Sequence, residues 1–463
     1  MTSSATLPAL TQVVSGLNLP SVLGGNTSVA GGSGFSVWAA EPREVFRFCA
    51  GQKAPFVKLQ RFLDKYRLND TDEGELPEGL FPCGWMGYFG YELNGFIEIL
   101  PQTAERDIDI PLIQLCFYDR AICYDHAEKI WWLVGLEIGG DSESVEDKLA
   151  SVENLLRQAE GTHVTLPDAG SLHNEAPDMS GFSCNMSREY YFEALERTQR
   201  YIYEGDVYQI NFSQRFETDY NACPIDLYHW QNRHNPSPYA AFIGADDFSI
   251  VSASPEMFIT LRDGFISTKP IKGTRKRITV GPGAEQINTA NFAELVRSEK
   301  EQAELNMIVD LERNDIARIC KPGTRNVIQP RTIEAYPTVF HAVATVRGEL
   351  REDVTFCDIL KGVFPGGSIT GAPKIRSMEI IDELEPTQRS VYTGSIGFIG
   401  LDGGVCLNIA IRTIIIKAGR AFAQTGGGIV ADSDPQAEWD ETITKALALL
   451  AGINSVQRIA YSG

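Results

Sequence analysis

The spacing of hydrophobic residues predicts a different structure on the two sides of residue 160. Before it, short apolar runs alternate with glycine-rich turns, as in 84–91 (GWMGYFGY), which predicts a mostly β region with one or two helices. Residues 110–125 and 129–138 are expected to form neighbouring strands. Residues 144–158 have the spacing of an amphipathic helix, with Ser144 near its N-cap.

A change in composition divides the chain. Residues 161–181 are rich in Gly, Pro, Ser, His and Asp and lack periodicity, which indicates a linker between an N-terminal region, 1–160, and a larger part, 182–463. In the larger part, long apolar strands are interspersed with helices, so we predict an α+β domain. The helices are expected over 188–203, 290–310, 375–384 and about 435–450, and the strands over 207–216, 239–243, 248–252, 257–262, 394–399, 405–416 and 421–424.

Composition and charge narrow the class of protein. The chain is 43% hydrophobic and 22% charged, as in ordinary globular proteins, and its net charge of -20 argues against nucleic acid or an anionic membrane as a partner. It has neither a charged leader followed by an apolar core nor a run of 18 apolar residues, so we expect a cytoplasmic protein. The nine cysteines form no Cys-x-x-Cys pair, and the histidines form no His-Glu-x-x-His motif, which disfavours disulfides and thiolate or imidazole metal sites.

Lys272 is a candidate nucleophile. The β-branched residues before Pro270 predict the end of a strand, and Gly273-Thr274 predicts a turn, so the lysine is expected to face a ligand where the chain leaves a sheet. Presenting its neutral amine at pH 7 costs about 4 to 5 kcal/mol unless the surroundings lower its pKa. By itself, the motif is explained better by a solvated surface lysine than by a nucleophile.

Two glutamate pairs could hold a metal ion. Glu301 and Glu304, and likewise Glu438 and Glu441, lie three residues apart in predicted helices, so each pair projects from one face. Two such pairs suit Mg²⁺, which takes a few carboxylates and keeps positions for water and an anionic substrate. A solvated helix face is the alternative for each pair.

Two further stretches could bind anions. Gly426, Gly427 and Gly428 follow a predicted strand and could expose backbone N–H groups, while Arg412 could hold a carboxylate with its planar fork. A tight turn and a surface arginine would explain them equally well. The glycine-rich segment 364–374 is not a nucleotide loop, because Ala372 stands where that motif requires lysine.

Several motifs in order resemble the chorismate-utilising enzymes, which include the anthranilate, isochorismate and aminodeoxychorismate synthases. The resemblance covers about 182–455 and weaker N-terminal segments at 84–93 and 111–126. It implies a four-layer α/β/β/α chorismate-binding fold with extended, mostly antiparallel sheets and an N-terminal region, similar to that of anthranilate synthase component I, packed against it. The motifs lie at 254–256, 270–274, 303–315, 364–374, 392–394, 408–413 and 426–441.

Two positions discriminate within the family. Gln209 stands where isochorismate-type members carry a water-activating lysine, and Lys272 stands where anthranilate synthases carry alanine. The chain therefore resembles the aminodeoxychorismate synthase component I branch, which aminates chorismate at carbon 4 for 4-aminobenzoate and folate synthesis. Departures at Leu305, Ala342 and Ala344 change no charge that the reaction uses.

The resemblance also implies roles for the site residues. Lys272 would be the nucleophile and Glu256 the acid, and Mg²⁺ would be held by Glu304 and Glu441 with Glu301 and Glu438 close by. A separate glutamine amidotransferase subunit, component II, would supply ammonia, since the chain has no cysteine in a Gly-x-Cys-x-Gly elbow. The residues implied to hold chorismate are Gly273, Thr274, His341, Thr370, Tyr392, Arg412, Gly426, Gly427 and Gly428.

Two alternatives stay open. The chain could be an anthranilate synthase component I. It could also be a catalytically silent subunit that holds tryptophan between its N-terminal part and Pro238, Tyr239 and Ala240. The presence of Lys272, Glu256 and all four metal-side glutamates argues against a silent subunit.

Overall fold

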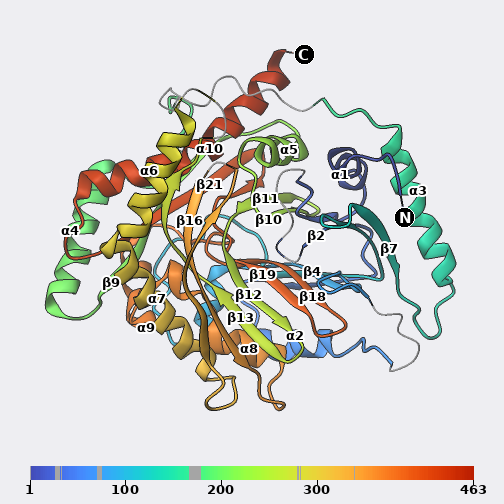
Figure 1. Ribbon diagram of the computed structural model, residues 1–463, viewed down its shortest axis with the longest axis horizontal. Helices are drawn as coiled ribbons and strands as arrows, with labels where there is room; N and C mark the ends of the chain where they lie inside the picture. Colours follow the sequence, from blue (N-terminus) through green and yellow to red (C-terminus); the bar gives the residue numbers. More distant parts are fainter. Residues whose placement is uncertain are drawn as a thin grey trace.

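Two large sheets form the body of the protein (Figure 1). The computed structural model describes residues 2–26, 32, 34–69, 76–165, 179–278, 281, 283–337 and 339–462, so most of the predicted linker, 166–178, lies outside the described residues. The strand pairs in both sheets are antiparallel.

The first sheet has 11 strands. In spatial order they are β17 (Gly371–Ala372), β9 (Gln209–Asp219), β21 (Arg420–Ile429), β20 (Thr413–Lys417), β11 (Phe248–Ser254), β10 (Tyr239–Gly244), β1 (Ser21–Leu23), β2 (Phe35–Ala39), β6 (Arg120–Asp125) and β7 (Ile130–Gly135), with β8 (Ser183–Cys184) paired to β9.

The second sheet has 10 strands. They are β14 (Ile271–Lys276), β16 (Val339–Glu349), β13 (Phe265–Lys269), β12 (Met257–Arg262), β19 (Val405–Asn408), β18 (Ser395–Gly400), β4 (Gly84–Phe89), β5 (Ile113–Tyr118) and β3 (Glu44–Phe48), with β15 (Asn326–Ala335) paired to β16.

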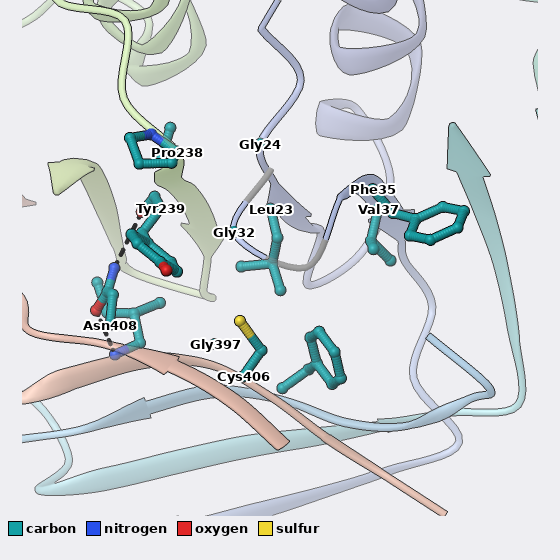
Figure 2. A pocket seen from close by; sticks show the side chains of 13 residues that line it. Leu23, Gly24, Gly32, Phe35, Val37, Pro238, Tyr239, Gly397, Cys406 and Asn408 are labelled. Carbon is teal, nitrogen blue, oxygen red and sulfur yellow. Dashed lines mark hydrogen bonds between the residues drawn. The ribbon is translucent and has the colours of Figure 1, made fainter. Parts of the chain in front are cut away.

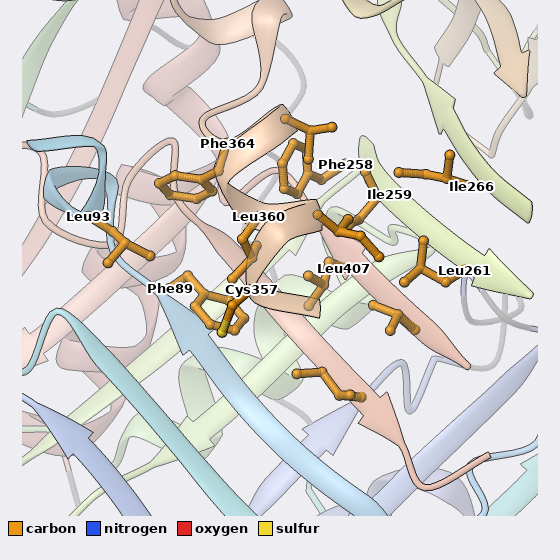
Figure 3. Packing of buried hydrophobic residues seen from close by; sticks show 14 of the residues in the cluster. Phe89, Leu93, Phe258, Ile259, Leu261, Ile266, Cys357, Leu360, Phe364 and Leu407 are labelled. Carbon is orange, nitrogen blue, oxygen red and sulfur yellow. The ribbon is translucent and has the colours of Figure 1, made fainter. Parts of the chain in front are cut away.

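Separate apolar cores define four layers. One core joins the first sheet to α1 (Leu7–Ser15), α3 (Val145–Glu160), α5 (Pro224–His234) and α10 (Pro435–Ser462). Another joins the second sheet to α2 (Pro55–Leu63), α7 (Glu299–Ala317) and α8 (Phe356–Val363), and Figure 3 shows Leu360 and Cys357 of α8 among side chains of this sheet. Two smaller cores contain residues of both sheets. The predicted four-layer fold with antiparallel sheets is thus confirmed.

The remaining helices lie near the β9–β21 and β14 edges. The helices α4 (Arg188–Glu204) and α9 (Lys374–Leu384) share a core with β9 and β21, and α6 (Ala284–Arg297) packs on β14. Short 3₁₀ helices occur at η1 (Tyr91–Phe96) and η2 (Gly367–Ile369). Among the helices of the described residues, none is long and apolar enough to cross a membrane.

The N-terminal region joins the fold through strand pairing. The strand β1 pairs with β10, and β4 pairs with β18, so strands from before residue 160 complete both sheets. The predicted packing of this region against the larger part is therefore closer than expected, because strands of both parts belong to the same two sheets. The pattern did not locate α1 and α2, whereas Ser144 caps α3 as expected by accepting a bond from Asp147 N–H.

Three predicted elements are interrupted in the structure. The stretch 110–125 divides at Asp119 into β5 and β6, and 405–416 divides into β19 and β20, because the chain crosses there from one sheet to the other. The helix over 290–310 is two helices, since the Ser298 side chain caps α7 by accepting from Glu301 N–H. Short polar runs also occur within uninterrupted helices and strands, so periodicity does not reveal these interruptions.

Candidate active site

Lys272 lies on β14, at the edge of the second sheet. The predicted turn after it is wrong: the strand continues, and its pairing with β16 shifts between Ile271↔Val343 and Thr274↔His341. Gly273 lies in this irregularity with φ +94°, a conformation that favours glycine. Such a bulge changes the direction of the neighbouring side chains, Lys272 among them.

The Lys272 amine faces the first sheet. A Cβ built on Gly428 of β21 would lie 3.5 Å from Lys272 Nζ and 2.6 Å from Gln209 Nε2, so the glycine leaves the space in which these groups approach. Burial lowers the pKa of Lys272, although the nearby carboxylates of Glu304 and Glu256 oppose the shift. The neutral amine is therefore more accessible at neutral pH than in a solvated lysine.

Glu256 is the buried acid of the site. Its side chain follows β11 and is 5% exposed, and its Oε1 has no hydrogen-bond partner in the described part of the chain. Burial raises its pKa, which favours the protonated carboxyl. Ser254 fixes its backbone, since Ser254 Oγ accepts from Glu256 N–H at 3.2 Å and donates to Ile409 O at 2.6 Å.

His341 is neutral and has one ring nitrogen available. Its Nδ1 lies 2.9 Å from Thr274 Oγ1 across the β14–β16 pair, while its buried Nε2 has no partner among the described residues. Burial lowers the pKa of His341 to about 3, and the Arg412 guanidinium acts in the same direction. A neutral imidazole can therefore contact a ligand without adding charge.

Arg412 lies where the chain crosses between the sheets. Its backbone is left-handed, with φ +50°, and its Nη1 approaches Asn235 Oδ1 at 3.5 Å, which leaves the rest of the fork for an anion. Burial lowers the pKa of Arg412, although the nearby carboxyl of Glu256 acts to raise it.

Thr370, predicted to hold chorismate, has its hydroxyl engaged within the protein. The hydroxyl donates to Gly366 O at 3.0 Å, so this side chain stabilises its own loop.

Gly426, Gly427 and Gly428 lie inside β21, paired with Ser213, Phe212 and Asn211 of β9. The prediction that they follow a strand is wrong, because glycine does not end this strand. On its other edge, the pairing of β21 with β20 reaches from Arg420 to Ala423 and stops before the glycines. The backbone N–H groups of the glycines on this edge are therefore not paired with β20 and could bind an anion.

The four predicted metal ligands come from α7 and α10. Burial lowers the pKa of Lys272, whereas the carboxylates of Glu304 on α7 and Glu441 on α10 raise it. Both helices therefore carry a carboxylate close to this amine. A Cβ on Gly427 would lie 3.3 Å from Glu438 Oε2 and 3.8 Å from Glu441 Oε1, so these two oxygens border one gap. One carboxylate of each pair, Glu304 and Glu441, therefore acts on the same amine.

Other groups hold three of these carboxylates. Glu301 Oε1 is bound by Arg275 at 2.7 Å, Glu438 Oε1 accepts from Ser433 at 2.6 Å, and Glu441 pairs with Lys445 at 2.7 Å. No three acidic, histidine or cysteine side chains of the described residues form a ready metal cluster. Glu301 Oε2, however, is buried and has no hydrogen-bond partner among the described residues. A carboxylate oxygen in this position is the kind of ligand that a divalent cation binds. Magnesium stays a prediction that these residues fit.

Lys374 holds the loop 364–374 against α7. Its Nζ donates to Val363 O at 3.0 Å and Pro365 O at 2.8 Å and pairs with Asp315 at 2.5 Å. The lysine is therefore used within the protein, which agrees with the rejection of a nucleotide loop. The loop places Ser368 beside Glu256, where it acts to lower the pKa of that carboxyl.

Glu312 of α7 is a second buried acid behind the site, and we expect Glu312→Gln to stabilise the protein. The side chain is 7% exposed and accepts from Thr268 Oγ1 at 2.8 Å. Burial raises its pKa to about 8 from an ordinary 4.5. Between these values the unfolded chain is ionised while the folded protein keeps its proton, so this group makes stability fall as pH rises from about 5 to 8.

The melting temperature of Glu312→Gln should therefore exceed that of the wild type by more at pH 8 than at pH 5. Glu128→Gln, at an exposed position, is the control and should give equal differences at both values. A Glu312→Gln difference that shrinks with rising pH would contradict the assignment.

The structure adds Arg275 and Lys445, which were not predicted, to this site and places Gln209, which the sequence singled out, inside it. The Gln209 side chain is 1% exposed, and neither its Oε1 nor its Nε2 has a partner among the described residues. Arg275 and Lys445 neutralise Glu301 and Glu441. Lys445 could have been found from its i,i+4 spacing to Glu441, whereas Arg275 depends on a contact between a strand and a helix.

Pro238, Tyr239 and Ala240 line a separate cavity between the sheets (Figure 2). Leu23 and Phe35 face it from the N-terminal region, and Cys406 and Asn408 from β19, with Asn408 Nδ2 donating to Tyr239 O at 3.0 Å. The cavity of about 30 Å³ has room for one or two waters, so a tryptophan side chain would need it to open. Tryptophan binding stays a prediction.

Comparison with known proteins identifies relatives of two activities. Residues 28–451 match the model of a family described as chorismate binding enzyme. Aminodeoxychorismate synthase component 1 of Bacillus subtilis is 37% identical, covering 84% of this chain and 81% of the relative. Anthranilate synthase component 1 of Acetivibrio thermocellus is 39% identical, covering 82% and 76%. The crystal structure of anthranilate synthase component I from Streptococcus pneumoniae superposes with a TM-score of 0.77 at 31% identity, covering 90% and 92%.

Proposed function

The chain belongs to the chorismate binding enzymes, and from this membership we propose that it aminates chorismate at carbon 4 to give 4-amino-4-deoxychorismate. Overall identity does not select this reaction, because relatives named for 4-amination and relatives named for anthranilate synthesis are equally similar. The choice rests on Lys272.

The observation that carries the proposal is the position of the Lys272 amine. It lies at a glycine-lined gap in the opposite sheet, its pKa is lowered by burial, and the buried acid Glu256 is close enough to act on that pKa. A lysine that merely balances charge would not need a depressed pKa. The combination of a neutral amine and a protonated carboxyl suits a displacement that needs a nucleophile and an acid.

In the proposed first step, the neutral Lys272 amine attacks carbon 2 of the chorismate ring. The ring double bond moves, the bond from carbon 4 to its hydroxyl breaks, and Glu256 protonates the departing oxygen so that water leaves. The amine proton that Lys272 loses on forming the new bond returns the carboxylate of Glu256 to its acid form. Chorismate less water is then bound to the lysine.

In the second step, ammonia attacks carbon 4, the double bond returns, and the bond between carbon 2 and Lys272 breaks. A proton that the new nitrogen at carbon 4 gives up is taken by the departing lysine nitrogen, so the lysine leaves as a free amine, nitrogen replaces oxygen at carbon 4 and the enzyme is restored. Arg412 and the edge of β21 hold substrate carboxylates, and neutral His341 lies beside the ring.

Glu304 and Glu441, with Glu301 and Glu438 close by, would hold Mg²⁺. When bound, it would draw electrons from the ring through a substrate carboxylate and make the diene more reactive. The unpartnered Glu301 Oε2 supports this part of the proposal.

A glutamine amidotransferase subunit is the proposed source of ammonia. Relatives are named component 1, which implies a second component for those proteins, and no cysteine of this sequence stands in a Gly-x-Cys-x-Gly elbow. Free ammonia is scarce at neutral pH, so a partner that releases it at this site would be needed. A cytoplasmic location is part of the same proposal.

The purified chain should convert chorismate with Mg²⁺ and ammonium, but not with glutamine, to a product that keeps the enolpyruvyl group and carries nitrogen at carbon 4. Mass spectrometry and NMR of the product test this, and heat-inactivated protein is the control. Anthranilate and free pyruvate would instead identify an anthranilate synthase. No turnover with intact chorismate binding would favour the silent subunit, and product from glutamine alone would contradict the need for a partner.

A further inference from the structure

Arg389 is buried between the loop that carries Tyr392 and strand β9, and all five of its N–H donors are used. Its side chain is 1% exposed. Nε donates to Glu385 Oε2 at 2.8 Å and Nη2 to Glu385 Oε1 at 2.6 Å. The remaining donors reach Asn211 O at 2.6 Å, Ile369 O at 3.0 Å and Thr393 Oγ1 at 3.3 Å. A guanidinium has five such donors in one fixed plane.

Glu385 completes a closed network on the other side. Its Oε1 also accepts from Ser213 N–H at 2.9 Å and from Ser213 Oγ at 2.7 Å. The Glu385 side chain is 2% exposed, so neither charge is shared with solvent. A buried ion pair is weak evidence for stability, because apolar residues of similar volume often serve as well. What apolar residues cannot reproduce is the fixed geometry of the bonds.

The partners of Arg389 are the walls of the proposed substrate site. Asn211 lies two residues after Gln209 on β9, Ile369 precedes Thr370, and Thr393 follows Tyr392. The walls also contact one another, since Asn211 N–H donates to Thr370 O at 2.8 Å. One side chain therefore sets the relative positions of three segments that are far apart in sequence.

Residues of the N-terminal region also contact Arg389 and the residue that follows it. Glu92 of η1 accepts from the backbone N–H of Arg389 at 2.7 Å and of Ser390 at 3.1 Å, and the Tyr91 ring lies 4.8 Å from the guanidinium. The held segment is left-handed at Ser390 and Thr393, with φ +58° and +59°. Non-glycine residues keep such conformations when their surroundings fix them.

We infer that Arg389 is a positioning residue, which with Glu385 and the N-terminal Glu92 aligns β9, the Ile369–Thr370 segment and Tyr392 around the substrate. The inference rests on the proposed function in taking the space beside Lys272 as the chorismate site. It does not depend on which amino product forms.

The test compares Arg389→Lys with Arg376→Lys as a matched control. Arg376, on α9, also binds a carboxylate with two nitrogens, Asp206 at 3.0 and 2.7 Å, but it is 36% exposed and its other carboxylate partner is Glu379 of the same helix. Turnover of chorismate with ammonium is measured well below each melting temperature. Arg389→Lys keeps the charge and loses the fork. Its kcat/KM for chorismate should fall about 10- to 100-fold, with Arg376→Lys near wild type.

Thr393→Val and Thr393→Ser keep the inference falsifiable if Arg389→Lys does not fold. Valine removes the hydroxyl that accepts from Arg389, and serine restores it. We expect a loss of kcat/KM in Thr393→Val that Thr393→Ser recovers. Lower melting temperatures with unchanged kcat/KM in Arg389→Lys or Thr393→Val would overturn the inference, as would an equal loss in Arg376→Lys. If wild-type protein makes anthranilate instead, the same comparison still decides the role of Arg389 while the proposed function fails.

Discussion

Lys272→Ala should lose amination at carbon 4 by roughly 10³-fold or more, because the step that releases water then has no nucleophile on the protein. Chorismate should still bind, since the variant keeps Arg412, His341 and the glycine edge of β21. With ammonia withheld, the wild-type protein should accumulate an adduct of chorismate less water on Lys272. Peptide mass mapping locates it. Adduct formation should accelerate as pH rises toward the lowered pKa of Lys272, since the neutral amine is the reactive form.

Lys269→Ala is the matched control for this experiment. Lys269 lies three residues earlier, on β13, and pairs with Glu334 at 2.5 Å, outside the site. This variant should form the adduct at the wild-type rate. Lys272→Ala leaves space that could admit ammonia to carbon 2, so its residual product should shift toward 2-amination. Lys272→Arg should show less of this shift, because a bulky permanent cation fills the space. An adduct on another residue, or undiminished 4-amination by Lys272→Ala, would show that Lys272 is not the nucleophile.

Glu304→Gln and Glu441→Gln should each lower activity on the order of 10²-fold at fixed magnesium, because each removes a charged ligand of the proposed cation. Both residues lie close enough to Lys272 to influence its pKa, so the effect combines weaker metal binding with a changed environment of the nucleophile. Binding of Mn²⁺, followed by electron paramagnetic resonance without substrate, separates the two contributions. It should weaken in both variants.

Two controls bracket the magnesium experiment. Asp440→Asn changes the exposed residue next to Glu441 on α10, and Glu146→Gln changes the first turn of α3, in the N-terminal region. Both should bind Mn²⁺ and turn over chorismate as the wild type does. Equal activity of all four variants across a magnesium titration would exclude Glu304 and Glu441 as ligands.

The sequence by itself determined the fold class and most of the elements after residue 181. Periodicity located α4, α9 and β12 closely, since each has a regular apolar face. It failed at 405–416 and 290–310, where the chain changes sheet or a side chain caps a new helix. Both events depend on contacts that the local spacing of apolar residues does not record.

The candidate chemistry divides in the same way. Lys272 and the glutamate pairs could be named from local spacing and neighbours, whereas Glu256 was named only through the resemblance to a family. The pairing of Gly428 with β9, the gap that faces Lys272 Nζ, and the five bonds of Arg389 were decided by the tertiary structure. Each of these joins residues from segments far apart in the chain. A pKa or a hydrogen bond depends on such neighbours, and strand pairing between distant segments brings them together.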